Sequence, residues 1–229
     1  MAAALVDTQA REQTVRVLIV EDHTLLADGL AVSLRQEGIA AEVAIGSTGE
    51  AIIDAARAFR PDIVLLDLVL GDEIGLSVPL IPDLRATGAL VLMLTGVTDP
   101  ALLGACLEAG AVGLVSKSEG FDAVFDTLMR AARRQTTLHA SERDRILGSL
   151  RDRRVEDRAR LAPFERLTSR ERVVLGALMN GASAEEIATT SFVSMATIRS
   201  QIRSILEKLG VHSQVAAVAL AHRSRWEAC

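Results

Sequence analysis

Five short apolar runs, each followed by a stretch with helical character, are the feature that most constrains how this chain folds. The runs are rich in β-branched residues, as buried strands are, and lie at residues 15–20, 41–45, 63–67, 89–94 and 112–115. Helix starts between them are marked by a capping box from Ser47 to Glu50 and by Asp99 followed by Pro100. Alternation of this kind makes right-handed crossovers. The first half is therefore predicted to be a doubly wound α/β domain with a five-stranded parallel sheet.

The second half carries only helical signals. We expect a tail at residues 1–14, the α/β domain at 15–134, an Arg-rich, partly helical linker at 135–163 and a small four-helix domain at 164–229. In that last domain, helices are expected at 170–179, 184–189, 195–209 and 213–221, because Thr168 to Glu171 and Ser183 to Glu186 are capping boxes and Gly210 is a stop signal. Trp226 and Cys229 are interpreted as tail residues without a function.

Charge is unevenly distributed along the chain. Residues 1–129 hold 7 Lys and Arg against 19 Asp and Glu, whereas residues 130–163 hold 10 against 5 and residues 164–229 hold 8 against 6. An acidic first half suggests a cation site, and a basic second half suggests a polyanionic partner. No apolar run is long enough to span a membrane or to act as a signal peptide, and the two cysteines lie far apart. A reducing cytoplasmic setting is expected.

Polar side chains gather where the predicted strands end. Glu21 and Asp22 follow "VRVLIV", and "PDIVLLD", "LVLMLT" and "AVGLVSK" end at Asp67, Thr95 and Lys117. Because the carboxyl ends of parallel strands share one edge of a sheet, these side chains should meet in one crevice. Three carboxylates suit Mg²⁺. Asp67 could act as nucleophile toward an activated phosphoryl group, while Lys117 and Thr95 bind its oxygens.

In its order of acidic pair, Asp, Thr and Lys, this constellation resembles the receiver domain of two-component response regulators, over about residues 14–134. The resemblance implies a flavodoxin-like fold, with Asp67 as the phosphoacceptor served by a sensor histidine kinase and with Thr95 and Lys117 reading out the phosphoryl group. Mg²⁺ would be held by Glu21, Asp22, Asp67 and the Val69 carbonyl. Three positions depart from the family pattern: Leu114 replaces a frequent aromatic residue, and Gly71 and Ser118 each replace a frequent proline.

A second resemblance comes from the stretches "LTSRE", "EIA", "VSMATIRSQIRSILEKLGV" and "VAAV". They are similar to the helix-turn-helix domain of LuxR/NarL-type regulators, over about residues 164–222. The apolar residues of 195–209 recur with the helical period, which leaves Arg199, Ser200, Arg203 and Glu207 outside. The resemblance implies DNA contacts from six residues: Thr197, Arg199, Ser200, Gln201, Arg203 and Lys208. Residues 213–221 would form a homodimer contact. Gln201 and Gln214 depart from the usual His and Arg, and Ser191 replaces a usually buried apolar residue.

The predicted function is that of a non-enzymatic transcription regulator whose phosphorylation promotes dimerisation and binding to an inverted DNA repeat. A regulator that responds to a partner or ligand through the receiver surface, without phosphorylation, stays open as the alternative, motivated by Leu114, Gly71 and Ser118. By composition alone, the second domain could also be a protein-interaction module. A phosphatase of the haloacid dehalogenase type would need a second acid where Val69 stands.

Overall fold

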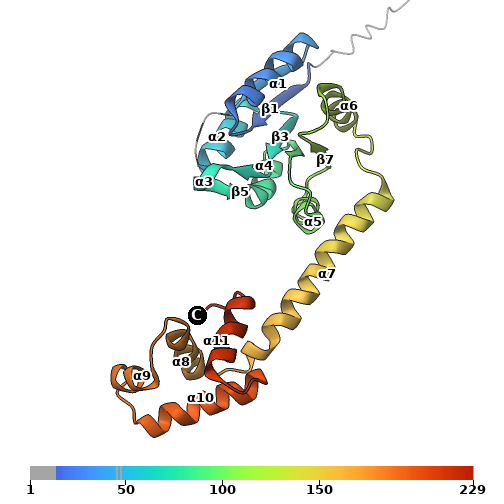
Figure 1. Ribbon diagram of the computed structural model, residues 1–229. Coiled ribbons are helices and arrows are strands. Elements are labelled where there is room, and N and C mark those ends of the chain that lie inside the picture. Colours follow the sequence, from blue (N-terminus) through green and yellow to red (C-terminus); the bar gives the residue numbers. More distant parts are fainter. Residues whose placement is uncertain (1–13, 45, 47, 229) are drawn as a thin grey trace, which may run out of the picture. The chain divides into compact units, whose positions relative to one another are not determined.

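The computed structural model describes residues 14–44, 46 and 48–228 (Figure 1). The chain divides into two compact units, with the division between Arg151 and Asp152. The predicted strand residue Ile45, the predicted cap Ser47 and the predicted tail residue Cys229 lie outside the described residues. Each unit has its own hydrophobic core and is described by itself.

The first unit is built on a five-stranded parallel sheet in the order β2-β1-β3-β6-β7. The strands are β1 (Arg16–Val20), β2 (Ala40–Val43), β3 (Ile63–Asp67), β6 (Leu90–Thr95) and β7 (Gly113–Ser116). This confirms the predicted doubly wound α/β fold with a five-stranded parallel sheet. From β1 the chain first moves outward to β2 and then returns to β3 on the other side. The strand order therefore switches between β1 and β3, which is where such sheets place their ligands.

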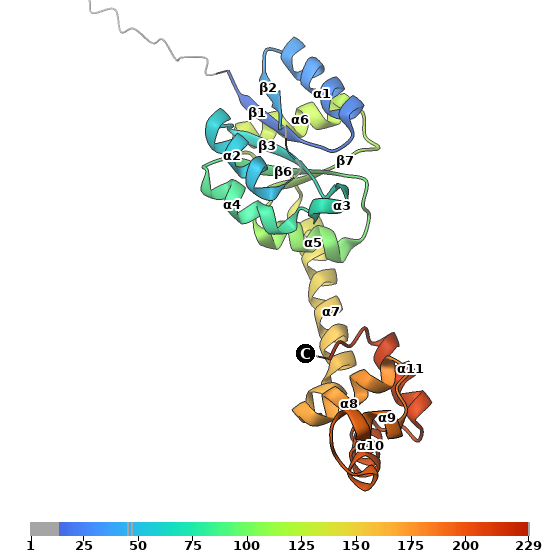
Figure 2. The same ribbon diagram turned by 90° about the vertical axis from the view of Figure 1, so that its left-hand side faces the viewer.

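Helices cover both faces of this sheet (Figure 2). On one face α1 (Thr24–Gln36) and α6 (Phe121–Ala132) share a core with alternate residues of the strands, among them Val17, Ile19 and Leu65. The other face is covered by α2 (Gly49–Phe59), α4 (Ile81–Ala86) and α5 (Pro100–Ala109). The N-caps Thr48 and Asp99 each accept a hydrogen bond from a backbone N–H of the helix that follows.

Between β3 and α4 the structure holds short elements that the sequence did not predict. A hairpin pairs β4 (Val69–Leu70) with β5 (Gly75–Leu76) around α3 (Gly71–Ile74), and η1 (Val78–Leu80) follows. The buried Ser77 hydroxyl donates a hydrogen bond to the backbone carbonyl of Asp67. This bond holds the segment that follows β5 against Asp67, the last residue of β3.

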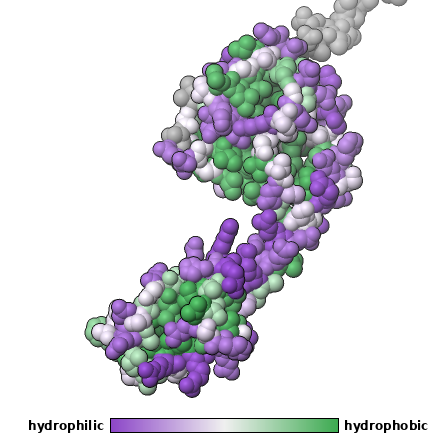
Figure 3. Space-filling view, in the orientation of Figure 1, coloured by the Kyte–Doolittle hydropathy of each residue, from purple (hydrophilic) through white to green (hydrophobic). Residues whose placement is uncertain are grey.

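The predicted Arg-rich linker contains α7, one continuous helix over Ala140–Glu165. Its surface is mostly hydrophilic (Figure 3), in keeping with the many arginines of this stretch. Within the first unit, Ile146 and Leu150 are buried, and α7 passes so close to Gly104 of α5 that a Cβ there would lie 2.9 Å from the Ile146 carbonyl oxygen. Phe164, near the other end of α7, belongs to the core of the second unit.

The second unit contains four further helices: α8 (Ser169–Met179), α9 (Ala184–Thr190), α10 (Met195–Leu209) and α11 (Gln214–Arg223). Both predicted capping boxes are present, and Gly210 ends α10 with a φ of 67°. One interpretation was wrong. Trp226 is no loose tail residue, because it is 7% exposed and stacks on Phe164 with ring centroids 5.4 Å apart. None of the helices that the structure describes is both long and apolar enough to cross a bilayer.

Candidate functional site

All five side chains predicted at the sheet edge lie at the carboxyl ends of the strands. Glu21 and Asp22 follow β1, Asp67 ends β3, Thr95 ends β6 and Lys117 follows β7. Backbone pairing continues past the strands, because the Lys117 N–H donates to the Thr95 carbonyl oxygen at 3.0 Å. The parallel register thus brings residues from distant parts of the sequence to one edge, at the switch in strand order.

Lys117 connects two of the three carboxylates. Its Nζ lies 2.8 Å from Oδ2 of Asp67 and 2.7 Å from Oε2 of Glu21. Glu21 and Asp67 are almost inaccessible, with side-chain exposures of 0% and 5%. One ammonium therefore faces two buried carboxylates, and the three carboxylates together leave the edge with net negative charge.

Thr95 is buried at the same edge but uses its side chain locally. Its Oγ1 accepts a hydrogen bond of 3.0 Å from the N–H of Val97, in the loop that leads to α5. This bond couples the threonine hydroxyl to the start of that loop.

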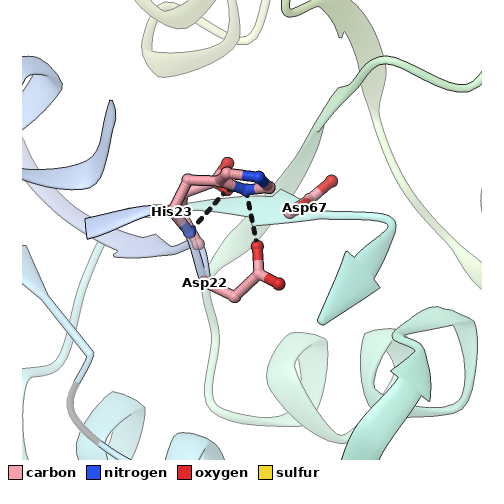
Figure 4. Close-up of side chains that lie close together, drawn as sticks. Asp22, His23 and Asp67 are labelled. Carbon is pink, nitrogen blue, oxygen red and sulfur yellow. Dashed lines mark hydrogen bonds and ion pairs between the residues drawn. The ribbon is translucent and has the colours of Figure 1, made fainter. Parts of the chain in front are cut away.

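His23 was not predicted as a member of this site. Its Nδ1 lies 2.9 Å from Oε1 of Glu21. The same nitrogen lies 2.8 Å from Oδ1 of Asp22 (Figure 4). Together with Asp67, these residues offer ligand atoms that all lie within 4.8 Å of one another. The only signal in the sequence was its position directly after the acidic pair. A His at that position is equally compatible with a residue that merely precedes a helix.

The environment shifts the titration of these groups in different directions. Burial raises the pKa of Asp67, and the hydrogen bond from Lys117 offsets only part of this effect. Burial alone would lower the pKa of Lys117, but its bonds to Asp67 and Glu21 raise it above the ordinary value. The hydrogen bond to Glu21, followed by the charge of Asp22, raises the pKa of the exposed His23 imidazole.

Asp22 gains a hydrogen bond from a position where the family often has proline. The N–H of Gly71 donates to Oδ2 of Asp22 at 3.0 Å, and Gly71 has a φ of 53°. A proline has no N–H and cannot adopt that φ. Burial would raise the pKa of Asp22, but this bond and the charge of His23 bring it below the ordinary value. Gly71 thus favours an ionised Asp22.

The donor set fits a hard divalent cation. Oε2 of Glu21 is buried and accepts no well-directed hydrogen bond, although the Lys117 ammonium is close to it. Asp22 is partly open to solvent, with a side-chain exposure of 38%. Carboxylates with room for water and phosphate oxygens are what Mg²⁺ prefers. The backbone N–H of Val69 helps to lower the pKa of Asp67, and the predicted role of the Val69 carbonyl as a metal ligand stays a prediction.

In the second unit, α10 presents the polar face that the sequence predicts. Ile198, Ile202 and Ile205 are buried, whereas the predicted DNA-contacting residues Thr197, Arg199, Ser200 and Arg203 are exposed. Ser194 caps α10, its hydroxyl accepting from the Thr197 N–H at 3.1 Å. Two guanidinium groups and the N-terminal end of a helix are therefore available to a phosphate-bearing partner.

Lys208 and Gln201 lie in different surroundings. Lys208 Nζ is 2.6 Å from Oε2 of Glu171 on α8, so its charge is already paired within the unit. Gln201 is half-buried beside a hollow of about 300 Å³. The DNA contacts expected of these two residues stay predictions.

The hollow beside Gln201 explains how the chain accommodates Ser191. Its walls come from α8, the turn before α10 and α10 itself, and Ser191 lines it together with Val173, Val174, Val193 and Ile198. Ser191 is exposed rather than buried. Its hydroxyl therefore stays hydrated, and what the chain lacks here is the volume of an apolar side chain.

Comparison with known proteins assigns both units to families. Residues 17–129 match the response regulator receiver domain, and residues 165–221 match the bacterial regulatory proteins of the luxR family. The nitrate/nitrite response regulator protein homolog of Haemophilus influenzae is 32% identical over 211 residues, which cover 91% of this chain and 97% of the relative. The response regulator protein VraR of Staphylococcus aureus is 28% identical over 208 residues, covering 91% and 96%.

A solved structure is similar along most of the chain. RcsB from Salmonella enterica serovar Typhimurium, bound to a promoter in the presence of the phosphomimetic BeF3−, is 25% identical, with a TM-score of 0.49. The alignment covers 90% of this chain and 97% of the RcsB chain.

Proposed function

This chain belongs to the response regulators that join a receiver domain to a LuxR-type DNA-binding domain, and from that premise we propose that phosphorylation of Asp67 controls its binding to DNA. The observation that carries this proposal is the contact of Lys117 with both Asp67 and Glu21 at the switch point of the sheet. A receiver domain implies a sensor histidine kinase as the phosphoryl donor, and action on DNA implies a cytoplasmic protein.

The proposed reaction is a phosphoryl transfer to a carboxylate. A carboxylate oxygen of Asp67 attacks the phosphorus of a phosphohistidine, the P–N bond breaks, and its electron pair remains on the histidine nitrogen. Lys117, already 2.8 Å from Oδ2 of Asp67, would pair with a phosphoryl oxygen, and Thr95 would donate its hydroxyl to another. Mg²⁺, held by Glu21, Asp22 and Asp67, would neutralise charge on the phosphoryl oxygens when bound.

Transmission of the signal would begin at Thr95. A hydroxyl that turns toward the phosphoryl group gives up its bond to the Val97 N–H, so the loop before α5 loses one restraint. This route does not need an aromatic residue at position 114. Leu114 packs at the edge of the core on the α5 side of the sheet.

The output would be a dimer on DNA. Two copies of α10 on one face of a duplex would read an inverted repeat whose half-site centres are about 10 base pairs apart. Arg199 and Arg203 are both exposed and four residues apart on α10. Each arginine that meets a phosphate should add about 0.9 to the salt slope of binding, and one that binds guanine should add about 1–3 kcal/mol of base discrimination.

Intact mass after incubation with a small phosphodonor and Mg²⁺ tests the phosphorylation. The wild-type chain should gain one acid-stable but base-labile phosphoryl group, and Asp67→Asn should gain none. Asp22→Asn, which keeps the nucleophile but removes a cation ligand, should raise the Mg²⁺ concentration needed for half-maximal phosphorylation. Equal uptake by wild type and Asp67→Asn would show that another residue accepts the phosphoryl group.

Leu114 favours a second candidate function, in which a partner or ligand at the receiver surface controls DNA binding without phosphorylation. The two functions differ in what phosphorylation does rather than in whether it occurs. Sedimentation of the chain with and without a phosphoryl mimic separates them. Phosphorylation control requires that the mimic shifts the population toward dimers, whereas identical distributions favour the phosphorylation-independent regulator.

A further inference from the structure

Phe192 has the most exposed large apolar side chain among the described residues. It is 95% exposed and lies in the turn between α9 and α10, with a φ of 54°. Helix-turn-helix turns often contain Gly, because this left-handed region suits Gly and strains residues that carry a Cβ. The chain therefore holds a bulky aromatic residue at a backbone position that disfavours it.

The fold of the second unit does not use this ring. The adjacent residue Val193 packs against the core, while Phe192 is left in solvent. The left-handed backbone at Phe192 belongs to the C-terminal cap of α9, because the N–H groups of Phe192 and Val193 donate to the carbonyl oxygens of Thr189 and Ala188. The ring itself adds nothing to this cap and stays exposed. A glycine would serve the same cap without the strain and without the exposed apolar surface, so the presence of the aromatic ring points to a role outside the folded unit.

The location of Phe192 indicates which partner would cover it. The residue lies two positions before Ser194, the N-cap of α10. On the first turns of that helix, Thr197, Arg199 and Ser200 are exposed. A duplex that engages the N-terminal end of α10 would therefore also reach the turn that precedes it.

We infer that Phe192 is an apolar DNA contact that packs against a thymine methyl group beside the half-site. The inference rests on the proposed function of α10 as the DNA-reading helix. An aromatic ring can contact the thymine methyl but releases no counterion. The contact should therefore add affinity without changing the salt dependence, unlike the contacts of Arg199 and Arg203.

Replacement of Phe192 by Gly gives two effects of opposite sign. Phe192→Gly relieves the strain at φ 54°, so the thermal midpoint of the second unit should rise by a few degrees. The same change removes the ring, so affinity for DNA should fall about tenfold. Asn also adopts this backbone region, and it gives the unfolded chain less conformational freedom than Gly does. Phe192→Asn should therefore show the same loss of DNA affinity.

The measurement uses the full chain, phosphorylated with a small phosphodonor and Mg²⁺, and a pool of random-sequence duplexes. Affinity is measured at two salt concentrations, and the bound fraction is sequenced. Val155→Ala is the matched control, because Val155 is 64% exposed and lies on α7, away from the turn. The DNA affinity of Val155→Ala should equal that of wild type. The Phe192 variants should bind more weakly with an unchanged salt slope and should lose a thymine preference at the edge of the half-site.

The outcomes separate this inference from the proposed function. If wild type fails to bind any duplex, DNA binding by the chain is refuted, and the proposed contact of Phe192 with DNA is refuted as well. If wild type binds and both Phe192 variants bind equally well, only the contact is refuted. A change in self-association of the Phe192 variants, with unchanged DNA affinity, would show that a second copy of the chain covers the ring instead.

Discussion

Glu171 offers the most quantitative test of how the second unit is held together. Its carboxylate is 7% exposed and accepts three hydrogen bonds, from Lys208 Nζ at 2.6 Å, the Ser204 hydroxyl at 2.7 Å and the Thr168 N–H at 2.7 Å. Burial would raise the pKa of this carboxyl, but the bonds from Lys208, Ser204 and Thr168 lower it to about 2 from the ordinary value of 4.5. The ionised form is therefore strongly stabilised in the folded unit.

Glu171→Gln keeps the shape and the capping bond but removes the charge. A lowering of the pKa from 4.5 to about 2 corresponds to about 3 kcal/mol of stability at neutral pH. We therefore expect the variant to lose about 2–3 kcal/mol. Because the folded pKa is depressed, this stability is present above pH 4.5 and is lost as the pH falls through about 2. The difference between wild type and variant should fall to less than half between pH 5 and pH 3.

Fluorescence of Trp226, the single tryptophan of the chain, measures the unfolding of this unit, because the indole stacks on Phe164 in its core. Urea titrations at pH 7, pH 5 and pH 3 give the free energy of unfolding for each protein. Glu185→Gln, at an exposed position of α9, is the control and should match wild type. Equal midpoints for wild type and Glu171→Gln at pH 7 would refute the reasoning, as would a difference that does not shrink with acid.

Three smaller predictions concern packing and backbone strain. Ser191→Leu should fill part of the hollow of about 300 Å³ and stabilise the second unit by about 1 kcal/mol, measured by Trp226 fluorescence in urea; an unchanged midpoint would mean that the hollow does not accept the side chain. Gly104→Ala puts a Cβ 2.9 Å from the Ile146 carbonyl oxygen. It should lower the free energy of unfolding of the first unit by about 1–3 kcal/mol, measured by thermal unfolding, and an unchanged stability would refute the close packing of α5 on α7. Arg60→Gly, at a cap with a φ of 51°, should stabilise the same unit by about 0.5–1 kcal/mol, and a loss of stability would show that the guanidinium makes a contact worth more than the strain.

Most of the sheet and the edge that bears the site could be predicted because their signals are local. The third strand was predicted with its observed bounds, Ile63–Asp67, since the apolar run of residues 63–66 lies between Pro61 with Asp62 and Asp67. The other four strands agree to within one or two residues in the part that the structure describes. Asp67, Thr95 and Lys117 followed from strand ends alone, because a parallel sheet aligns those ends.

What the sequence did not reveal depends on contacts between distant residues. Trp226 looked like a tail residue because its stacking partner Phe164 precedes it by 62 positions. The ion pair of Lys208 with Glu171 was not predicted, because the two residues lie on different helices. The β4–β5 hairpin has strands of two residues each, too short for an alternating pattern to show.

His23 was missed for another reason. A His next to two acids is ambiguous until the backbone shows where its ring points, and here the ring lies 2.8 Å from Asp22 and 2.9 Å from Glu21. The sequence shows that Gly71 replaces a frequent proline, but it does not show which group the additional N–H binds. Only the structure shows that the Gly71 N–H bonds to Asp22.

The most direct test of the central claim is DNA affinity measured before and after phosphorylation of the same full-length protein. Wild type and Asp67→Asn are incubated with a small phosphodonor and Mg²⁺, the extent of modification is read by intact mass, and each sample is titrated against DNA selected by the wild-type protein. We predict that phosphorylated wild type binds at least several-fold more tightly than the unmodified protein, while Asp67→Asn stays unmodified and its affinity does not respond. Fully phosphorylated wild type that binds the same DNA with unchanged affinity would contradict the account.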